Sequence, residues 1–177
     1  KVLLSADYQG RVMTSTATGD TGTSFGWLNY DLIAATEKKK QFNPFGGEER
    51  FWMGPEGGQY ALYFKAGDSF NIKHWQVPSF IDTAMYNVIQ SDKSSATFSK
   101  KTSITNFSGA TFGIAIERKI SLLAKEELAA KLQINIPADI HFVAFETDNK
   151  VTNTGSNNWT RDKGLLSIWL LGMFTPS

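Results

Sequence analysis

Two long stretches in which apolar and polar residues alternate, 96–107 and 111–123, constrain the fold of this chain most strongly. Between them lies Asn106-Phe-Ser-Gly109, a composition typical of a tight turn. The second stretch has an apolar face and a polar face: Phe112, Ile114, Ile116 and Ile120 against Glu117, Lys119 and Ser121. Because successive side chains of a strand point to opposite faces, this pattern predicts a strand buried on one side. The two stretches together predict a long β-hairpin.

Shorter stretches rich in β-branched and apolar residues predict further strands. They lie at 2–5, 9–17, 84–90, 140–153 and 165–173, with alternation also at 60–65 and a partly extended stretch at 25–35. One helix is predicted, at 124–132, where Glu127 is placed to pair with Lys131. Strands separated by polar turns, with one short helix, predict an all-β fold: an antiparallel β-sandwich in a single domain over residues 1–177.

The charge balance and the absence of cysteine exclude several classes of function. Eighteen Lys and Arg against 17 Asp and Glu give a net charge of +1, so nothing favours a nucleic-acid partner. The chain has no cysteine, which rules out disulfides and thiolate chemistry. His74 and His141 are too far apart for a helical metal pair, and neither a metal nor a cofactor is predicted. No apolar run reaches the roughly 18–20 residues of a membrane span.

The two ends of the sequence lead to an expectation about what surrounds it. The chain begins at Lys1 with no signal peptide and stops just after an apolar stretch, so we expect the natural protein to continue on the C-terminal side. An open half of a sandwich exposes edge strands, so we also expect a homo-oligomer or association with a missing C-terminal part. A periplasmic or secreted location is favoured over a cytoplasmic one.

The segment 43–60 has the composition of a ligand-binding site. Its 18 residues include five Gly, two Pro, three Glu, one Arg and one Trp. Glycines let a ligand approach the backbone closely, and an aromatic ring beside fixed polar groups suits a polar ring such as a sugar. In this hypothesis Trp52 stacks on the sugar. The other predicted binding residues are Arg11, Glu48, Arg50, Glu56 and Gln59.

Several alternatives stay open for these residues. Two of the carboxylates Glu48, Glu49 and Glu56 would serve as an acid–base pair if they were held about 5–9 Å apart. Otherwise Glu49 or Glu56 pairs with Arg50 and orders the loop. Trp52 is either a sugar platform or a core anchor. The candidates for catalysis are Glu48, Glu56 and His74, the last because Trp75 and Pro78 lie close to it in sequence.

Two further polar segments are ambiguous. The basic run 38–40 is expected to be a solvated loop rather than a binding patch. Trp159 and Arg161, beside Asn157 and Asn158, either line a cleft or belong to a polar hairpin turn.

Three blocks of the sequence, 9–16, 46–59 and 151–169, together resemble an uncharacterised bacterial family related to the galactose mutarotase-like (aldose 1-epimerase) proteins. The resemblance covers nearly the whole chain. It implies a large antiparallel supersandwich that handles carbohydrate. Two departures bear on activity: residues 165–172 lack the catalytic histidine of true mutarotases, and their glutamate base lies beyond the end of this chain. Epimerase chemistry is therefore not carried over to any residue.

Three hypotheses of function follow. The first is a small-molecule carbohydrate-binding domain of mutarotase-like fold, with catalysis unproven. The second is a sugar-active enzyme, either an epimerase or a carboxylate-based glycosidase or lyase. The third is a structural or interaction module in which the glycine-rich segment packs internally. The third hypothesis predicts that Trp52 is fully buried and that no pocket opens beside Glu56.

Overall fold

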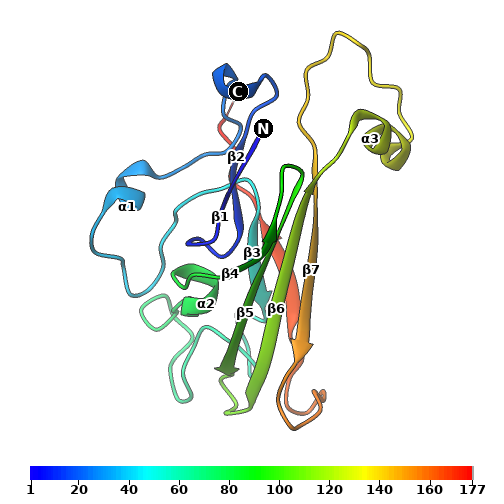
Figure 1. Cartoon of the computed structure of the whole chain (residues 1–177). Helices are drawn as coiled ribbons and strands as arrows, with labels where there is room; N and C mark the ends of the chain where they lie inside the picture. The colour runs from blue at the N-terminus through cyan, green and yellow to red at the C-terminus, as the bar shows by residue number, and fades with distance from the viewer. Residues whose placement is uncertain (177) are drawn as a thin grey trace.

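The protein, described by a computed structural model over residues 1–176, is mainly β and its sheets are antiparallel (Figure 1). The strands are β1 Val2–Ser5, β2 Arg11–Ser15, β3 Arg50–Gly54, β4 Asn87–Ser91, β5 Ser95–Thr105, β6 Thr111–Leu122, β7 Phe145–Asn153 and β8 Ser167–Leu171. The helical elements are the 3-10 turn η1 Gly19–Thr21 and the helices α1 Tyr30–Ala34, α2 Ser79–Asp82 and α3 Lys125–Leu132. The predicted β class is thus confirmed.

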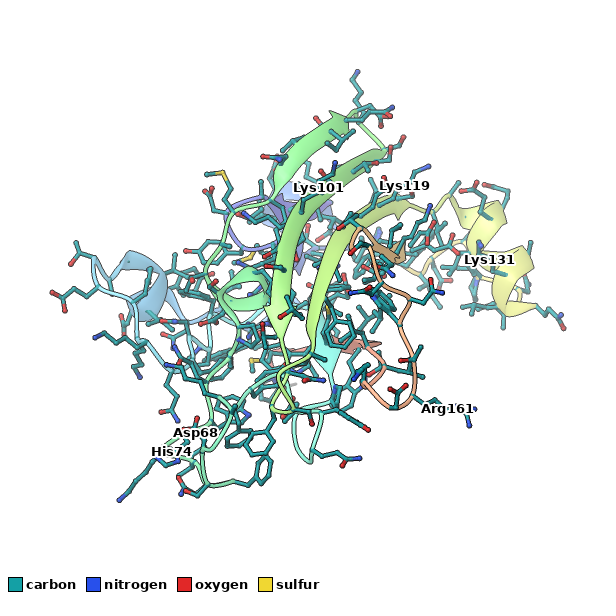
Figure 2. The ribbon with its side chains drawn as sticks, turned by 90° about the horizontal axis from the view of Figure 1, so that it is seen from below. Asp68, His74, Lys101, Lys119, Lys131 and Arg161 are labelled. Atoms are coloured by element: carbon teal, nitrogen blue, oxygen red, sulfur yellow. The ribbon has the colours of Figure 1, made fainter. Side chains whose placement is uncertain are left out.

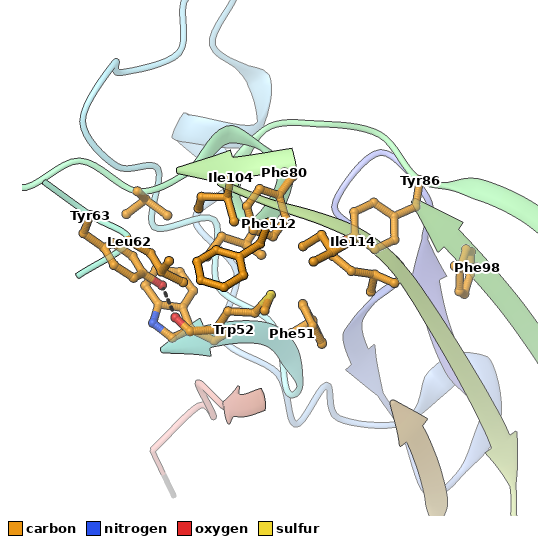
Figure 3. Packing of buried hydrophobic residues seen from close by; sticks show 14 of the residues in the cluster. Phe51, Trp52, Leu62, Tyr63, Phe80, Tyr86, Phe98, Ile104, Phe112 and Ile114 are labelled. Carbon is orange, nitrogen blue, oxygen red and sulfur yellow. Dashed lines mark hydrogen bonds between the residues drawn. The ribbon is translucent and has the colours of Figure 1, made fainter. Parts of the chain in front are cut away.

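The strands form one large sheet and two small ones. The large sheet has the order β4-β5-β6-β7, and the two-stranded sheets are β1-β2 and β3-β8. In Figure 1 β3 and β8 lie behind the large sheet, and β1 and β2 lie at its upper left. Val12 of β2 and Phe51 of β3 share one core cluster with Phe98, Ile114 and Ile116 of the large sheet (Figure 3). The core therefore lies between the large sheet and the two small ones.

The long hairpin is confirmed as β5 and β6, which pair without a bulge from Ser95↔Ser121 to Thr105↔Thr111. The predicted apolar face is buried, at 0 to 4% exposure for Phe112, Ile114, Ile116 and Ile120. The same face also carries Arg118, which is fully buried. The alternation of apolar residues therefore predicted the buried face of this strand correctly, but it did not predict that Arg118 is buried on that face.

Two predicted strands are wrong. Residues 60–65 form turns and bends, and the consecutive residues Ala61, Leu62 and Tyr63 are all buried. In a strand with one buried face, neighbouring residues would instead alternate between buried and exposed. In the stretch 25–35, Gly26 and Leu28 make only single bridges, and α1 begins at Tyr30. Asn29 starts this helix because its side-chain oxygen accepts a hydrogen bond from the backbone N–H of Leu32.

The predicted helix is confirmed as α3, but its expected ion pair is not formed. Lys131 pairs with Glu146 of β7 at 3.0 Å, and Glu127 instead accepts a hydrogen bond from the backbone N–H of Ala124. Within residues 1–176, no helix combines the length and the apolar character that a membrane crossing needs.

Strand β8 is an apolar edge. Among the described strands it pairs only with β3, and Ile168, Trp169, Leu170 and Leu171 are 37 to 48% exposed. Unpaired edges with apolar side chains favour association with another strand. The expected self-association stays a prediction.

Candidate functional site

The glycine-rich segment 43–60 is folded into the interior rather than presented to solvent. Its central part forms β3, in which all five residues are buried. Trp52 is 2% exposed, and its ring contacts those of Phe42 and Tyr63 at centroid distances of 6.1 and 5.4 Å. Its indole N–H donates to the carboxylate of Glu56. Trp52 is therefore a core anchor in this structure, and neither face of its ring is open for stacking on a ligand.

Two of the predicted binding residues, Arg11 and Glu48, tie the segment to β2. Arg11 donates to the backbone carbonyl of Gly46 at 2.7 Å and to the side-chain oxygen of Gln9 at 2.8 Å. Glu48 accepts hydrogen bonds from the backbone N–H and the hydroxyl of Ser15. A side chain at Gly46 would place its Cβ 2.1 Å from the carbonyl oxygen of Trp27, so this close approach requires glycine.

A second set of buried charges joins the segment to the large sheet. Arg118 of β6 pairs with Glu49 and donates from Nε to the side chain of Asn149 at 2.9 Å. Burial raises the pKa of Glu49, while the charge of Arg118 opposes this shift. Burial, reinforced by the charge of Arg50, lowers the pKa of Arg11 to about 9. Because buried charges are tolerated only when paired and hydrogen-bonded, these groups fix how the layers meet.

Arg50 does not pair with either glutamate that the sequence suggested. It lies 3.3 Å from the carboxylate of Asp82 in α2 and donates to the carbonyl of Ile81 at 2.7 Å. Asn43 completes this cluster by donating from its side chain and its backbone to the two oxygens of Asp82, at 2.8 and 3.2 Å. Asp82 is thus held by two residues of the glycine-rich segment.

Asp82 also lines the first large cavity of the molecule, which we call the Asp82 cavity. Its volume is about 810 Å³, and it lies between the tip of β5 and the loops around residues 38–40, 62–66 and 74–83. Tyr63, Asp82 and Asn106 are buried in its wall, whereas Phe64, Gln76 and Thr102 present aromatic, amide and hydroxyl groups that are at least partly exposed. The exposed lysines 38–40 also line it, and Lys38 donates to the carbonyl of Leu32 within α1 and to that of Ala35 just after it.

His74 is the one predicted site residue that lines the Asp82 cavity. Its side chain is exposed and lies 3.0 Å from the hydroxyl of Ser69, and Figure 2 shows it beside Asp68 at the edge of the molecule. Arg50 and Trp52 support the wall of the cavity through Asp82 and Tyr63. Arg11 and Glu48 lie in the buried network, Glu56 is half-buried and Gln59 is exposed, and none of these four lines the cavity.

A second cavity, of about 770 Å³, lies between the tip of the β5–β6 hairpin and residues 153–163. We call it the Trp159 cavity. Asn153, Asn157, Asn158, Trp159 and Thr160 line it, which agrees with the cleft alternative for this polar segment. Arg161 is exposed and does not line it (Figure 2). The sequence signal for this cavity was the pairing of one Trp with several amides.

The chain belongs to a family of unknown function, DUF6786, and the match to the model of this family covers residues 1–177. None of the curated proteins compared with the chain matches it. No solved structure matches it either.

Proposed function

We propose that this protein binds carbohydrate in the Asp82 cavity, and that its fold is of the galactose mutarotase-like supersandwich type. The observation that carries the proposal is the Asp82 cavity itself, about 810 Å³ in volume and lined by aromatic, amide, hydroxyl and carboxylate groups. Small-molecule sites in proteins have volumes of roughly 300–1,000 Å³ and combine apolar walls with a few fixed polar groups. No reaction is part of the proposal.

Asp82, whose side chain is only 4% exposed, offers a ligand one fixed acceptor in the wall of the cavity. Arg50 and Asn43 hold its carboxylate in one position with three hydrogen bonds, which leaves about one of the roughly four acceptor sites of an ionised carboxylate. A sugar hydroxyl donating to Asp82 would thus meet a fixed acceptor. Phe64, half-buried and braced by Phe70 at a ring-centroid distance of 4.9 Å, supplies apolar surface for the face of a sugar ring.

The burial of Trp52 favours a structural role for the glycine-rich segment. Trp52 is 2% exposed, and Glu56 lines neither large cavity, as expected if the segment packs internally. Arg50 and Asn43 of the segment hold Asp82, and Trp52 packs against Tyr63, at the wall of the Asp82 cavity. The segment therefore supports the proposed site from behind instead of contacting the sugar.

A carbohydrate screen with matched variants tests this proposal. The double variant His74→Ala/Gln76→Ala removes two side chains that line the Asp82 cavity, and His141→Ala/Gln90→Ala removes the same residue types at exposed positions outside both cavities. We expect the wild type and the control to bind the same sugars, and the cavity variant to bind them at least fivefold more weakly. Absence of sugar binding by the folded wild type would reject the function. Equal binding by both variants would reject the location.

A further inference from the structure

The two cavities adjoin one another, and we propose that they bind a single oligosaccharide that crosses from one to the other. The inference rests on the proposed carbohydrate function and specifies its ligand: a chain of several sugar units rather than a monosaccharide. It adds the Trp159 cavity as a second binding region.

The linings of the two cavities are continuous at the tip of the β5–β6 hairpin. Ser103 lines both cavities. The hydroxyl of Thr105, in the Asp82 cavity, lies 2.8 Å from that of Thr111, in the Trp159 cavity. Asn106, in the Asp82 cavity, donates to the carbonyl of Lys163, in the Trp159 cavity, at 2.8 Å. A ligand leaving one cavity thus meets the other across a surface of small hydroxyl groups.

The boundary between the cavities is low because its side chains are short. Ser103 faces Gly113 in the strand register, and a Cβ on Gly113 would lie 3.0 Å from the backbone nitrogen of Gly155. Glycine at this position lets residues 154–155 lie against β6. It also leaves no side chain beside Ser103 that would separate the two cavities.

Trp159 lines the Trp159 cavity and carries a hydrogen-bond donor that no described residue satisfies. The indole N–H of Trp159 is buried and has no partner among residues 1–176. The ring is half-buried and meets Phe112 edge-on, at a centroid distance of 6.1 Å and an angle of 81°. A buried N–H without an acceptor is unfavourable, and a hydroxyl or ring oxygen of a ligand would satisfy it.

The polar groups around Trp159 match an uncharged ligand. Asn153 fixes the loop, donating to the carbonyl of Asn157 at 2.8 Å and accepting from the backbone N–H of Gly155 at 2.9 Å. Asn157 and Asn158 add amides to the lining, and amides both donate and accept, as sugar hydroxyls do. The two charged residues of the cavity, Asp162 and Lys163, lie 4.0 Å apart and offset one another. The Trp159 cavity thus carries no excess charge, whereas Lys38, Lys39, Lys40 and Lys65 add exposed positive charge to the Asp82 cavity.

The two volumes set the length of the ligand. The Asp82 and Trp159 cavities measure about 810 and 770 Å³, and each is within the roughly 300–1,000 Å³ range of a complete small-molecule site. A single sugar ring fills only part of one cavity, so a chain of several rings is needed to contact both Asp82 and Trp159.

The experiment compares chain lengths on one protein. A glycan array presents neutral sugars of several types, each as a mono-, di-, tri- and tetrasaccharide, together with oligopeptides of similar length. For the sugar type that binds, titration calorimetry then measures the affinity of each chain length. Trp159→Phe removes the N–H and keeps an aromatic ring beside Phe112. Ser103→Leu raises the boundary between the cavities, and Ser99→Leu, on the same face of β5 but outside both cavities, is its control.

We expect the tetrasaccharide to bind at least tenfold more tightly than the monosaccharide. Trp159→Phe and Ser103→Leu should each weaken the tetrasaccharide at least fivefold and leave the monosaccharide within twofold, while Ser99→Leu changes neither. Equal affinity for both lengths, or unchanged tetrasaccharide binding in folded Trp159→Phe and Ser103→Leu, would overturn the inference and leave the proposed function standing. Binding of peptides in place of sugars, or of no sugar at any length, would overturn both.

Discussion

Arg50 of β3 and Asp82 of α2 form a buried ion pair, with 3.3 Å between the guanidinium and the carboxylate and only 4% exposure of each side chain. The guanidinium also lies 4.5 Å from the ring centroid of Trp52. The pair links the glycine-rich segment to the wall of the Asp82 cavity. Both charges are shielded from water, so each one offsets the desolvation cost of the other.

Breaking this pair from one side should destabilise the fold strongly. Arg50→Met or Asp82→Asn leaves one buried charge without its partner, and we expect each to lower the free energy of unfolding by about 3–5 kcal/mol. The double variant removes both charges and should cost clearly less than the sum of the single variants. Urea denaturation of all four proteins measures this coupling. Additive losses would show that the two side chains act independently.

Two buried tyrosines should respond in opposite directions to loss of the hydroxyl. The hydroxyl of Tyr63 donates to the carbonyl of Met53 at 2.7 Å, whereas the buried hydroxyl of Tyr86 has no partner among residues 1–176. We expect Tyr63→Phe to lower the free energy of unfolding by about 1–3 kcal/mol, and Tyr86→Phe to leave it unchanged or raise it by about 1 kcal/mol. Each variant is the other's control in urea denaturation. A loss of similar size in both would contradict the assigned hydrogen bonding.

The same tyrosines predict a loss of stability at alkaline pH. Burial raises the pKa of both Tyr63 and Tyr86 above the ordinary value of 10.0. Above pH 10 the unfolded chain releases these protons while the folded chain keeps them, so the stabilisation present below pH 10 is progressively lost. Each tyrosine should lower the free energy of unfolding by about 1.4 kcal/mol per pH unit there. Denaturation at pH 9, 10 and 11 should give a shallower slope for Tyr63→Phe than for the wild type. An unchanged slope would refute the prediction.

Trp52 and Trp169 are opposite one another in the β3–β8 pair but differ in exposure, at 2% and 44%. Trp52→Phe should create a cavity and lower the free energy of unfolding by about 1–3 kcal/mol, whereas Trp169→Phe should change it by less than about 0.5 kcal/mol. Sugar affinity at a temperature where both variants are folded should stay within twofold of the wild type. Loss of sugar binding in folded Trp52→Phe would contradict a purely structural role for Trp52.

The local patterns that predicted the fold correctly were those in which burial alternates over many residues. The β5–β6 hairpin is the strongest case, because alternating positions over both stretches agree on one buried face. The pattern at 60–65 was misleading because it spans only six residues. Leu62 and Tyr63 are both buried there by contacts with residues outside this stretch, such as the hydrogen bond from the Tyr63 hydroxyl to the carbonyl of Met53.

The residues of the proposed site were predicted less well. The glycine-rich segment was identified as unusual, and its charged residues are buried and bonded, but its role depends on partners far away in sequence. Glu49 meets Arg118, and Arg50 meets Asp82. Of the predicted residues, only His74 lines the Asp82 cavity. Nothing in the sequence distinguished Asp82 except its position shortly after His74, Trp75 and Pro78.

The antiparallel β class, the long hairpin and helix α3 follow from the sequence alone, because strand and helix periodicities are local properties of the chain. Which polar residues are buried and which line a cavity depends on contacts formed only in the folded molecule. A charged side chain enters the interior only where other groups compensate it, through hydrogen bonds as for Arg11 and Glu48 or through a partner of opposite charge as for Arg50 and Glu49. Those partners lie 32 residues apart for Arg50 and Asp82 and 69 residues apart for Glu49 and Arg118, beyond the reach of any local pattern.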